Sequence, residues 1–503
     1  MTSMPRFVVR VSLGCAMVFA ASTAPAAAAM YYVSTAGNDT NSCAAAQAAA
    51  TPKLTIAAGL TCLAAGDTLF LRGGTYTGSS NLIDSERSSV PSGTSWAAAI
   101  TIAGYPGETV TIRPPDGRQA IRLTAGAPHY LIFQDLILDG IDQTILSVNG
   151  GPDLVYLSSG AHHNRFERLD VRNNAANGFA LSSHNGPADY NEILNCAIHD
   201  NGRLDEGNSG YGIYLKTSHN TIAGNDIYRN NGYGVHQNAS AGHGNNNVIL
   251  GNRIHDNAVH GTIGVGGSTS YAVVLINGDN NLIANNLIYG NHGGILIYNN
   301  TTNARVYNNT ITGNRYNAID LQYFGSAPFI RNNIVFNNGG TIVNYGGTGT
   351  PVVEHNLMGD PAFVDAAGKD FRLNWFSTAK DQGVMLPEVT EDFAGVRRPQ
   401  AGIYDIGAFE YVDSVSSAQP SPGTTAPPAP GTTAPPAPDA TTQPAPDTTT
   451  QPVPDTGTTT GTQPAPAPTT QPAQTTTSAP ARATKSVRST RAKRTTTTTG
   501  TTK

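Results

Sequence analysis

Four polar side chains alternate with aliphatic residues in two short apolar runs near the middle of the chain. Tyr214 and Lys216 lie in the first run, and His236 and Asn238 lie in the second. Because successive side chains of a β-strand point to opposite faces, we expect all four on one outward face. Lysine, tyrosine and histidine exchange protons, so the patch suits acid–base catalysis.

β-Elimination on a uronate polymer is the reaction that these groups suit best. It needs a base for the C5 proton, positive charge beside the carboxylate as that group becomes enolate-like, and an acid for the leaving oxygen. Lys216 is the expected base or charge neutraliser, and Tyr214 or His236 is the expected second proton-transfer group. A lysine base must first lose its proton, which requires a pKa well below about 10.4.

Substrate-binding residues are expected beside these groups. Asn238 belongs to the same patch, and Ser182 lies on the preceding repeat of the same face. His260 falls in an insertion, residues 258–270. Insertions on one side of a repeat protein commonly build the walls of its binding face.

A second insertion, residues 203–210, contains the acidic pair Asp205 and Glu206. Carboxylate oxygens are the ligands that Ca²⁺ takes in proteins. The pair is therefore the expected metal site, and calcium is the one cofactor that the sequence suggests. The simpler interpretation of the whole patch is an exposed polar face without activity.

The pattern NxIxxN occurs five times around these residues. Its copies begin at Asn225, Asn252, Asn286, Asn309 and Asn332. The last two steps are 23 residues each, so longer steps are this unit with an inserted loop. Cys196 and Leu169 fill the first position of two degenerate copies.

Most copies are followed by turn residues and a second apolar alternation of three to five residues, which predicts strands rather than helices. Two or three strands in each unit of about 23 residues predict a parallel β-helix, whose stacked coils close one core. The asparagines should then stack at a bend with their amide groups pointing inward, where they hydrogen-bond to one another. We also expect a stacked outer row of His199, Tyr228 and His255.

Segments at both ends of this region resemble known proteins. The opening resembles the N-terminal cap and first strands of secreted right-handed parallel β-helix proteins of the pectate-lyase-like superfamily, at Tyr31–Ser34, Gly37–Asp39, Leu54–Ile56, Gly66–Leu69 and Gly73–Tyr76. Further on, Asp360–Asp365 and Asp405–Glu410 resemble the C-terminal closing module of bacterial surface members. The resemblance covers roughly residues 31–411.

This resemblance implies the fold more specifically than the activity, since the fold carries lyases, hydrolases, epimerases and non-catalytic adhesins. Gly242-His243-Gly244 matches one motif of polygalacturonase-type hydrolases, but their other two motifs are missing. No complete signature of alginate epimerases or of the classical pectate lyases is present either.

The chain divides into three predicted parts. Residues 1–29 are predicted as a signal peptide, because Arg6 and Arg10 precede or open an apolar run and three alanines precede residue 30. Residues 30–411 are the β-helix domain, and residues 412–503 are a disordered tail rich in Pro, Thr and Ala. Within the domain we expect a cap, core repeats and a closing module at 30–75, 120–358 and 359–411.

Export predicts an oxidising environment, outside the cytoplasm or at the cell surface. There Cys43 and Cys62 are expected to form a disulfide, with Cys196 left over. No apolar run is long enough to span a membrane.

Charge bears on the partners of the protein. Residues 1–29 carry a net +2 and residues 413–503 a net +3, so with the whole chain at −5 the residues between them carry −10. This balance argues against a nucleic-acid partner and favours calcium assistance for a polyanionic substrate. The basic end of the tail is suited to contact with an anionic cell envelope, and we expect a monomer.

Taken together, the sequence predicts a secreted all-β protein, a right-handed parallel β-helix with a cap and a disordered tail. The leading functional prediction is lyase-type processing of an acidic polysaccharide. The alternative is a non-catalytic surface protein that binds a glycan or another partner along the solenoid.

Overall fold

A computed structural model describes residues 28–144, 152–202, 210–258, 270–400 and 402–413. The predicted signal peptide up to residue 27 and the predicted tail from residue 414 therefore lie outside the described residues. Among the described residues, no helix is both long and apolar enough to cross a membrane.

Three parallel sheets make up the fold, which is a right-handed parallel β-helix as predicted. Sheet A contains β1 (Met30–Val33), β2 (Thr68–Leu71), β5 (Ile100–Gly104), β8 (Leu131–Gln134), β11 (Arg165–Glu167), β14 (Glu192–Leu194), β17 (Thr221–Ala223), β20 (Val248–Leu250), β23 (Leu282–Ala284), β26 (Arg305–Tyr307), β29 (Phe329–Arg331) and β32 (Val352–Glu354). Sheet B contains β3 (Gly74–Thr77), β6 (Val110–Arg113), β9 (Ile137–Asp139), β12 (Asp170–Arg172), β15 (Ala197–His199), β18 (Asp226–Tyr228), β21 (Arg253–His255), β24 (Leu287–Tyr289), β27 (Thr310–Thr312) and β30 (Ile334–Phe336). Sheet C contains β4 (Ile83–Asp84), β7 (Ile121–Leu123), β10 (Val155–Leu157), β13 (Phe179–Leu181), β16 (Ile213–Leu215), β19 (Val235–Asn238), β22 (Tyr271–Ile276), β25 (Gly293–Tyr298), β28 (Asn317–Phe324) and β31 (Gly340–Gly347).

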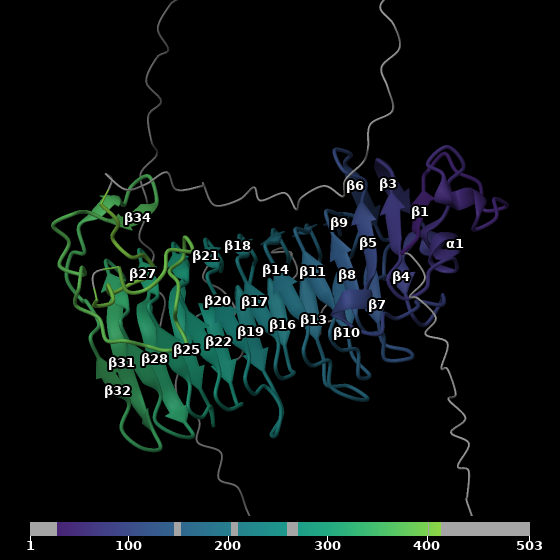
Figure 1. Ribbon diagram of the computed structural model, residues 1–503. Helices are drawn as coiled ribbons and strands as arrows, with labels where there is room; N and C mark the ends of the chain where they lie inside the picture. The colour runs from purple at the N-terminus through teal and green to yellow at the C-terminus, as the bar shows by residue number, and fades with distance from the viewer. Residues whose placement is uncertain (1–27, 145–151, 203–209, 259–269, 401, 414–503) are drawn as a thin grey trace, which may run out of the picture. The chain divides into compact units, whose positions relative to one another are not determined.

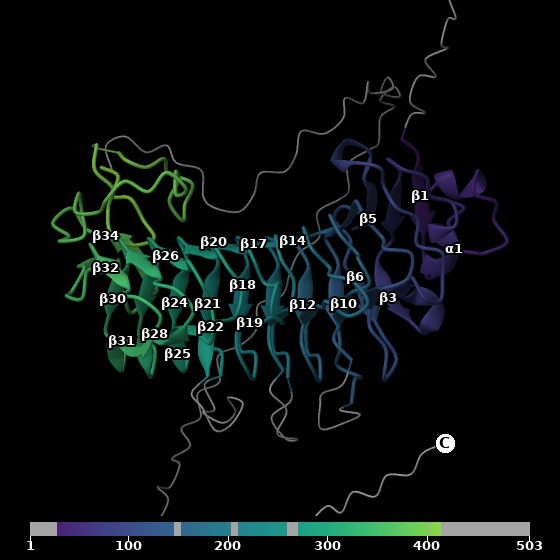
Figure 2. The same cartoon turned by 90° about the horizontal axis from the view of Figure 1, so that it is seen from below.

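Strands of each sheet lie side by side in chain order, as Figure 1 and Figure 2 show. In the central coils the chain passes from a strand of sheet A to one of sheet B and then to one of sheet C before it returns. The core lies between the three sheets, where each coil stacks its aliphatic residues on those of the next. On sheet A, for example, Ile193 pairs with Ile222 and Ile222 with Ile249, and each is at most 1% exposed. Each such side chain contributes about 1.5–3 kcal/mol by leaving water.

The predicted asparagine ladder runs along the corner between sheets A and B. The backbone N–H and the amide Nδ2 of Asn225 both donate to Oδ1 of Asn252, at 3.0 and 2.9 Å. Asn252 repeats this pattern on Asn286, and Asn286 repeats it on Asn309. Cys196 fills the ladder position before Asn225, as predicted, and its N–H donates to Oδ1 of Asn225.

The last copy of the predicted repeat is wrong by one residue. Asn309 bonds to Asn333 and not to Asn332, and Asn314 bonds to Asn338 and not to Asn337. Val335, and not Ile334, accordingly pairs with Ile311 in sheet B. Asn332 instead takes a φ of 57° and donates to the backbone oxygen of Val384 in the closing segment. The residue before the ladder position is left-handed in other coils as well, as at Asn285 and Asn308, so Asn332 occupies that position and the ladder residue follows it.

The ring row on the outside of sheet B is confirmed. The centroids of His199 and Tyr228 are 4.6 Å apart, and those of Tyr228 and His255 are 5.1 Å apart. The row continues to Tyr289 at 4.8 Å. Its histidines are hydrogen-bonded to aspartates, as His199 is to Asp170, so the row is a structural feature.

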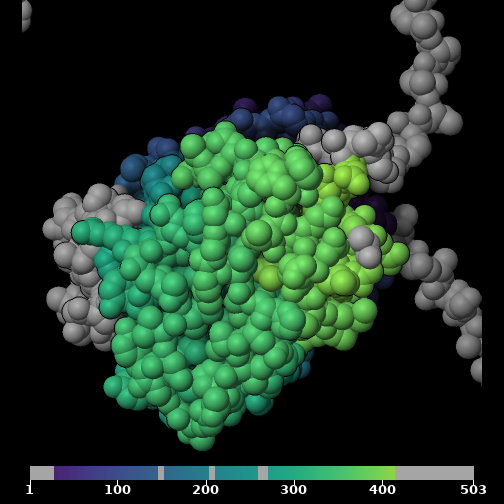
Figure 3. Space-filling view, turned by 90° about the vertical axis from the view of Figure 1, so that its left-hand side faces the viewer, coloured from purple at the N-terminus to yellow at the C-terminus, as the bar shows by residue number. Residues whose placement is uncertain are grey.

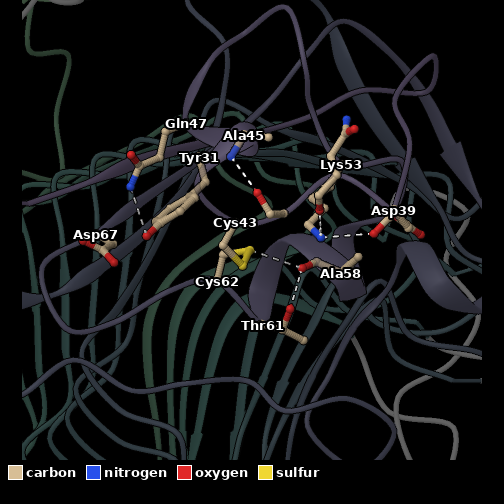
Figure 4. The surroundings of a disulfide bond; sticks show 12 residues. Tyr31, Asp39, Cys43, Ala45, Gln47, Lys53, Ala58, Thr61, Cys62 and Asp67 are labelled. Atoms are coloured by element: carbon tan, nitrogen blue, oxygen red, sulfur yellow. Dashed lines mark hydrogen bonds between the residues drawn. A yellow bond between two sulfur atoms is a disulfide. The ribbon is translucent and has the colours of Figure 1, made fainter.

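Different segments pack against the solenoid near its two ends. At the N-terminal end the predicted disulfide joins Cys43 to Cys62 beside the short helix α1 (Ile56–Leu60), as Figure 4 shows, with Cα atoms 5.4 Å apart. At the other end the antiparallel strands β33 (Phe363–Asp365) and β34 (Asp370–Leu373) belong to a cluster that packs on Tyr289. Figure 3 shows this end, with the yellow-green closing residues beside the green last coils.

Sheet C changes in width along the solenoid. Its strands contain three residues in β7, β10, β13 and β16, four in β19, six in β22 and β25, and eight in β28 and β31. Figure 1 shows the longer arrows at the green end. The outward face of sheet C therefore offers more surface positions toward the C-terminal coils.

Candidate functional site

The predicted patch lies on the outward face of sheet C. Ile213, Leu215 and Val235 are fully buried in the core, as expected from strand alternation. Tyr214 lies between two of them on β16 and pairs in register with His236 on β19. The two short runs thus place these side chains on neighbouring coils of one face.

Lys216 follows the last residue of β16 and is partly exposed. Its Nζ lies 4.7 Å from the centroid of the Tyr214 ring, and its backbone N–H donates to the oxygen of Leu181 on β13. Ser182 and Asn238 occupy the matching positions on the coils before and after it, because Leu181 and Gln237 both pair with Leu215. Adjacent strands are about 4.8 Å apart, so Ser182, Lys216 and Asn238 form a polar row across three coils.

His236 faces outward but does not reach the surface. It is 2% exposed and is enclosed by the rings of Tyr211, Tyr214 and Tyr233, whose centroids lie 4.6, 5.2 and 4.6 Å from its own. Its Nδ1 has no hydrogen-bond partner among the described residues. Burial, followed by the charge of Lys216, lowers the pKa of His236 to about 3, so the imidazole is neutral near pH 7.

Asp153 and Asn177 belong to the same face and were missed in the sequence. Asn177 Nδ2 donates to Oδ1 of Asp153 at 2.6 Å, and Asn177 Oδ1 accepts from the backbone N–H of Tyr211 at 2.8 Å. Burial raises the pKa of Asp153 to about 6, although the bonds from Asn177 and the charge of Lys216 act in the opposite direction.

These residues were missed because they precede their strands and fall outside the alternating runs. The signal was a shared offset, since Asp153, Asn177, Tyr211 and Tyr233 each lie two residues before the first residue of a sheet C strand. Tyr156 adds a further phenol to this face, on β10. The sequence therefore contains this row at a constant offset, but Asp, Asn and Tyr at these positions do not form a motif that identifies a site.

Three predicted residues cannot be placed. Asp205, Glu206 and His260 lie outside the described residues, so their predicted roles in metal and substrate binding stay predictions. Among the described residues, no three His, Cys, Asp or Glu side chains gather closely enough to hold a metal ion.

One cavity among the described residues lies outside sheet C. It has a volume of about 310 Å³ and lies in the closing segment, where Arg372, Trp375 and Tyr411 are among its lining residues. None of the residues that line it belongs to sheet C.

Comparisons with known proteins agree with the fold. The family described as "Right handed beta helix region" matches residues 141–261 and 206–358. The chain is 34% identical over 190 residues to "Pectate lyase PEL9" of Emericella nidulans (strain FGSC A4), a match that covers 35% of this chain and 40% of the relative. The crystal structure of pectate lyase Pel9A superposes with a TM-score of 0.52 at 17% identity, over 76% of this chain and 96% of that one. The chain is thus a right-handed β-helix similar to pectate lyases, and the match spans less than half the length of the curated relative.

Proposed function

We propose that this protein cleaves an acidic polysaccharide by β-elimination on the outward face of sheet C. The observation that carries the proposal is the position of Lys216, whose Nζ lies 4.7 Å from the centroid of the Tyr214 ring and close enough to Asp153 for its charge to act on that carboxyl group. The partial similarity to a pectate lyase supports the same class of substrate. It does not favour the alternative, a non-catalytic glycan-binding surface protein.

The chemistry follows from what elimination requires. A base takes the proton from C5, the electrons form a C4=C5 double bond, and the C4–O bond breaks while the leaving oxygen gains a proton. Positive charge beside the substrate carboxylate stabilises the enolate-like state between these events. On this face Lys216 supplies the amine or ammonium, and the Tyr214 hydroxyl supplies the proton for the leaving oxygen.

Lys216 can serve this reaction in two ways. As a free amine it takes the C5 proton, and as an ammonium it neutralises the carboxylate while another group takes the proton. In the second role, Asp153 is the group that takes the proton, because its carboxyl group is ionised above about pH 6. The dependence of rate on pH distinguishes the two roles. If Lys216 is the base, activity rises as Lys216 loses its proton, and if Lys216 acts as an ammonium, activity falls.

The remaining predicted residues fill supporting roles in the proposal. His236 holds the Tyr214 ring by stacking and does not contact substrate, because it is enclosed. Ser182 and Asn238 bind sugar hydroxyl groups on either side of Lys216. His260 and the calcium ligands Asp205 and Glu206 are proposed for the walls of the face.

Action outside the cytoplasm is part of the proposal. It is supported by the Cys43–Cys62 disulfide, since such bonds persist in oxidising compartments. The predicted signal peptide points to the same location.

The test is an ultraviolet absorbance assay for unsaturated uronates on pectate, alginate and glycosaminoglycans, with and without calcium. The proposal expects a signal on at least one of these polymers. No signal on any of them, together with glycan-array binding that Lys216→Ala leaves unchanged, would support the non-catalytic surface protein instead.

A further inference from the structure

The C-terminal half of the sheet C face carries a second group of polar and aromatic residues, separate from Lys216. It lies on the longest strands, β25, β28 and β31, where the face is widest. Tyr214 and Asp320 belong to one outward row, which passes through His236, Val274 and Leu296. Four strand steps of about 4.8 Å separate them, or roughly 19 Å along the solenoid.

Asp320 is an unusual residue for an outward position, because it is fully buried. Its neighbours Ile319 and Leu321 fill the core, so Asp320 points the other way. Its carboxylate accepts a short hydrogen bond from the Tyr271 hydroxyl and one of 2.8 Å from Asn317 Nδ2. Burial raises the pKa of Asp320 despite these two donors.

Asn317 connects this carboxylate to the surface. Its Nδ2 lies 3.4 Å from the hydroxyl of Tyr345, which is 51% exposed. Asp320 and Tyr271 therefore fix the orientation of an amide whose outer neighbour is an exposed phenol. Both N–H groups of this buried amide are used within the protein, so the Tyr345 hydroxyl is the exposed polar group of the cluster that can bind a ligand.

Exposed tyrosines surround this cluster. Tyr323 is 63% exposed and Tyr316 is 39% exposed, while Tyr298 on β25 is partly exposed and lies 5.9 Å from Tyr323 between centroids. Tyrosine rings combine an apolar face with a polar tip, and large aromatic groups rarely stand exposed together without a partner.

We propose that Tyr298 and Tyr345 form a saccharide subsite that anchors the polymer three to five strand steps from β16, roughly 14–24 Å along the solenoid, with Tyr345 positioned by the buried Asn317–Asp320 pair. The inference rests on the proposed function and adds the place where a distant sugar unit binds. The tyrosine rings contact the C–H face of that unit, while the Tyr345 hydroxyl binds its hydroxyl groups.

The chemistry of the cluster favours a sugar over other ligands. The buried Asp320 carboxylate disfavours an anion at this position, so the subsite takes the hydroxyl-bearing side of a sugar unit rather than its carboxylate. Each exposed ring also ends in a hydroxyl group, which suits a polar sugar better than an apolar protein or lipid surface. Lys216 is therefore the group that we expect to bind the carboxylate of the substrate.

The experiment measures the cleavage and binding of polygalacturonate and of oligogalacturonides of increasing length. It compares wild type with Tyr298→Ala/Tyr345→Ala, with Tyr298→Phe, and with the control Tyr190→Ala. Tyr190 is 46% exposed, stacks on His163 and His219 and belongs to no strand of sheet C, so it tests the loss of an exposed tyrosine outside the proposed subsite. Circular dichroism confirms that each variant is folded.

We expect the double variant to bind long oligomers about tenfold more weakly, in line with the loss of two ring contacts. Its KM should rise for long oligomers and stay unchanged for the shortest ones, with kcat unchanged throughout. Tyr298→Phe keeps the ring but loses its hydroxyl and should bind with an affinity between those of wild type and the double variant, whereas Tyr190→Ala should retain the affinity of wild type.

Two failures can be told apart. A wild-type protein that cleaves and binds long oligomers, with a double variant that does the same at equal KM, would overturn the subsite and leave the proposed function standing. A wild-type protein that neither binds nor cleaves any member of the series would overturn the proposed function for this polymer, and the subsite with it.

Discussion

The rings of Tyr214 and His236 stack on neighbouring strands with their centroids 5.2 Å apart. Because the stack is closed by Tyr211 and Tyr233, it removes the imidazole from water while leaving Tyr214 partly exposed. A histidine in this position orients a neighbour, and its own charge is suppressed. Because the enclosed stack accommodates the neutral imidazole, we expect acid to destabilise the fold around His236.

Replacing His236 by Phe should reduce the acid sensitivity of the fold. The pKa of His236 is lowered from 6.5 to about 3 in the folded protein, so between these values the unfolded chain binds a proton that the native protein does not. Stability due to this group is present above pH 6.5 and is lost as pH falls through the window. Wild type and His236→Phe should diverge by about 1.4 kcal/mol per pH unit there. Denaturant unfolding at several pH values measures this, and parallel curves would contradict it.

Replacing Asp153 by Asn should alter the acidic limb of the pH–rate profile. With its pKa raised to about 6, the carboxyl group ionises as pH rises through 6, and activity that needs the carboxylate should rise with it. Asp153→Asn should flatten this limb and lower the maximum rate. The control is Asp279→Asn, an exposed aspartate hydrogen-bonded to Asn303 away from the sheet C face. An unchanged limb in Asp153→Asn would remove Asp153 from the reaction.

Replacing Asn252 by Ala should destabilise the solenoid strongly. The Asn252 side chain is fully buried, accepts two bonds from Asn225 and donates to Asn286 and to the backbone of Ile222. Each buried partner left without its bond costs about 1–3 kcal/mol, so the total loss should be several kcal/mol. Asn280→Ala, which removes an exposed amide bonded to Asn246, should cost much less. Equal midpoints of urea unfolding for the two variants would contradict the ladder.

Cys196 should resist alkylation in the native protein. Burial is the main reason that the pKa of this thiol is raised, to about 12, and the thiolate is the reactive form. Iodoacetamide at mildly alkaline pH should label it only after the protein unfolds. Mass spectrometry of the peptide counts the label, and rapid labelling of the folded protein would show that this part of the core opens readily.

Much of the fold was predictable because it is built from a short sequence pattern that repeats along the chain. The aliphatic residue of each NxIxxN copy and the amides beside it recur at nearly constant spacing, so their burial and stacking could be inferred without coordinates. A further ladder was missed, from Asn164 through Asn191 and Asn220 to Asn247. It precedes the strands of sheet A, and its asparagines are followed two residues later by a buried core residue, as Asn220 is by Ile222, so the signal was present in the sequence.

The site was less predictable than the fold. Strand alternation gave the outward direction of Tyr214, Lys216 and His236, but it gave no information on what covers each side chain. His236 is enclosed by Tyr211 and Tyr233, which precede their strands and follow no alternating pattern. Contacts made by residues outside the regular elements depend on turn geometry, which spacing does not encode.

One matched pair of variants tests the role of Lys216 in cleavage most directly. Lys380 also places its Nζ over a tyrosine, 4.2 Å from the Tyr411 ring, but in the closing segment. Release of unsaturated product from polygalacturonate is measured for wild type, Lys216→Ala and Lys380→Ala. We predict that Lys216→Ala lowers kcat at least about a hundredfold with the fold intact, as expected for loss of a proton-transfer or charge-stabilising group, while Lys380→Ala keeps the wild-type rate. Equal rates for the two variants would contradict the assignment of Lys216.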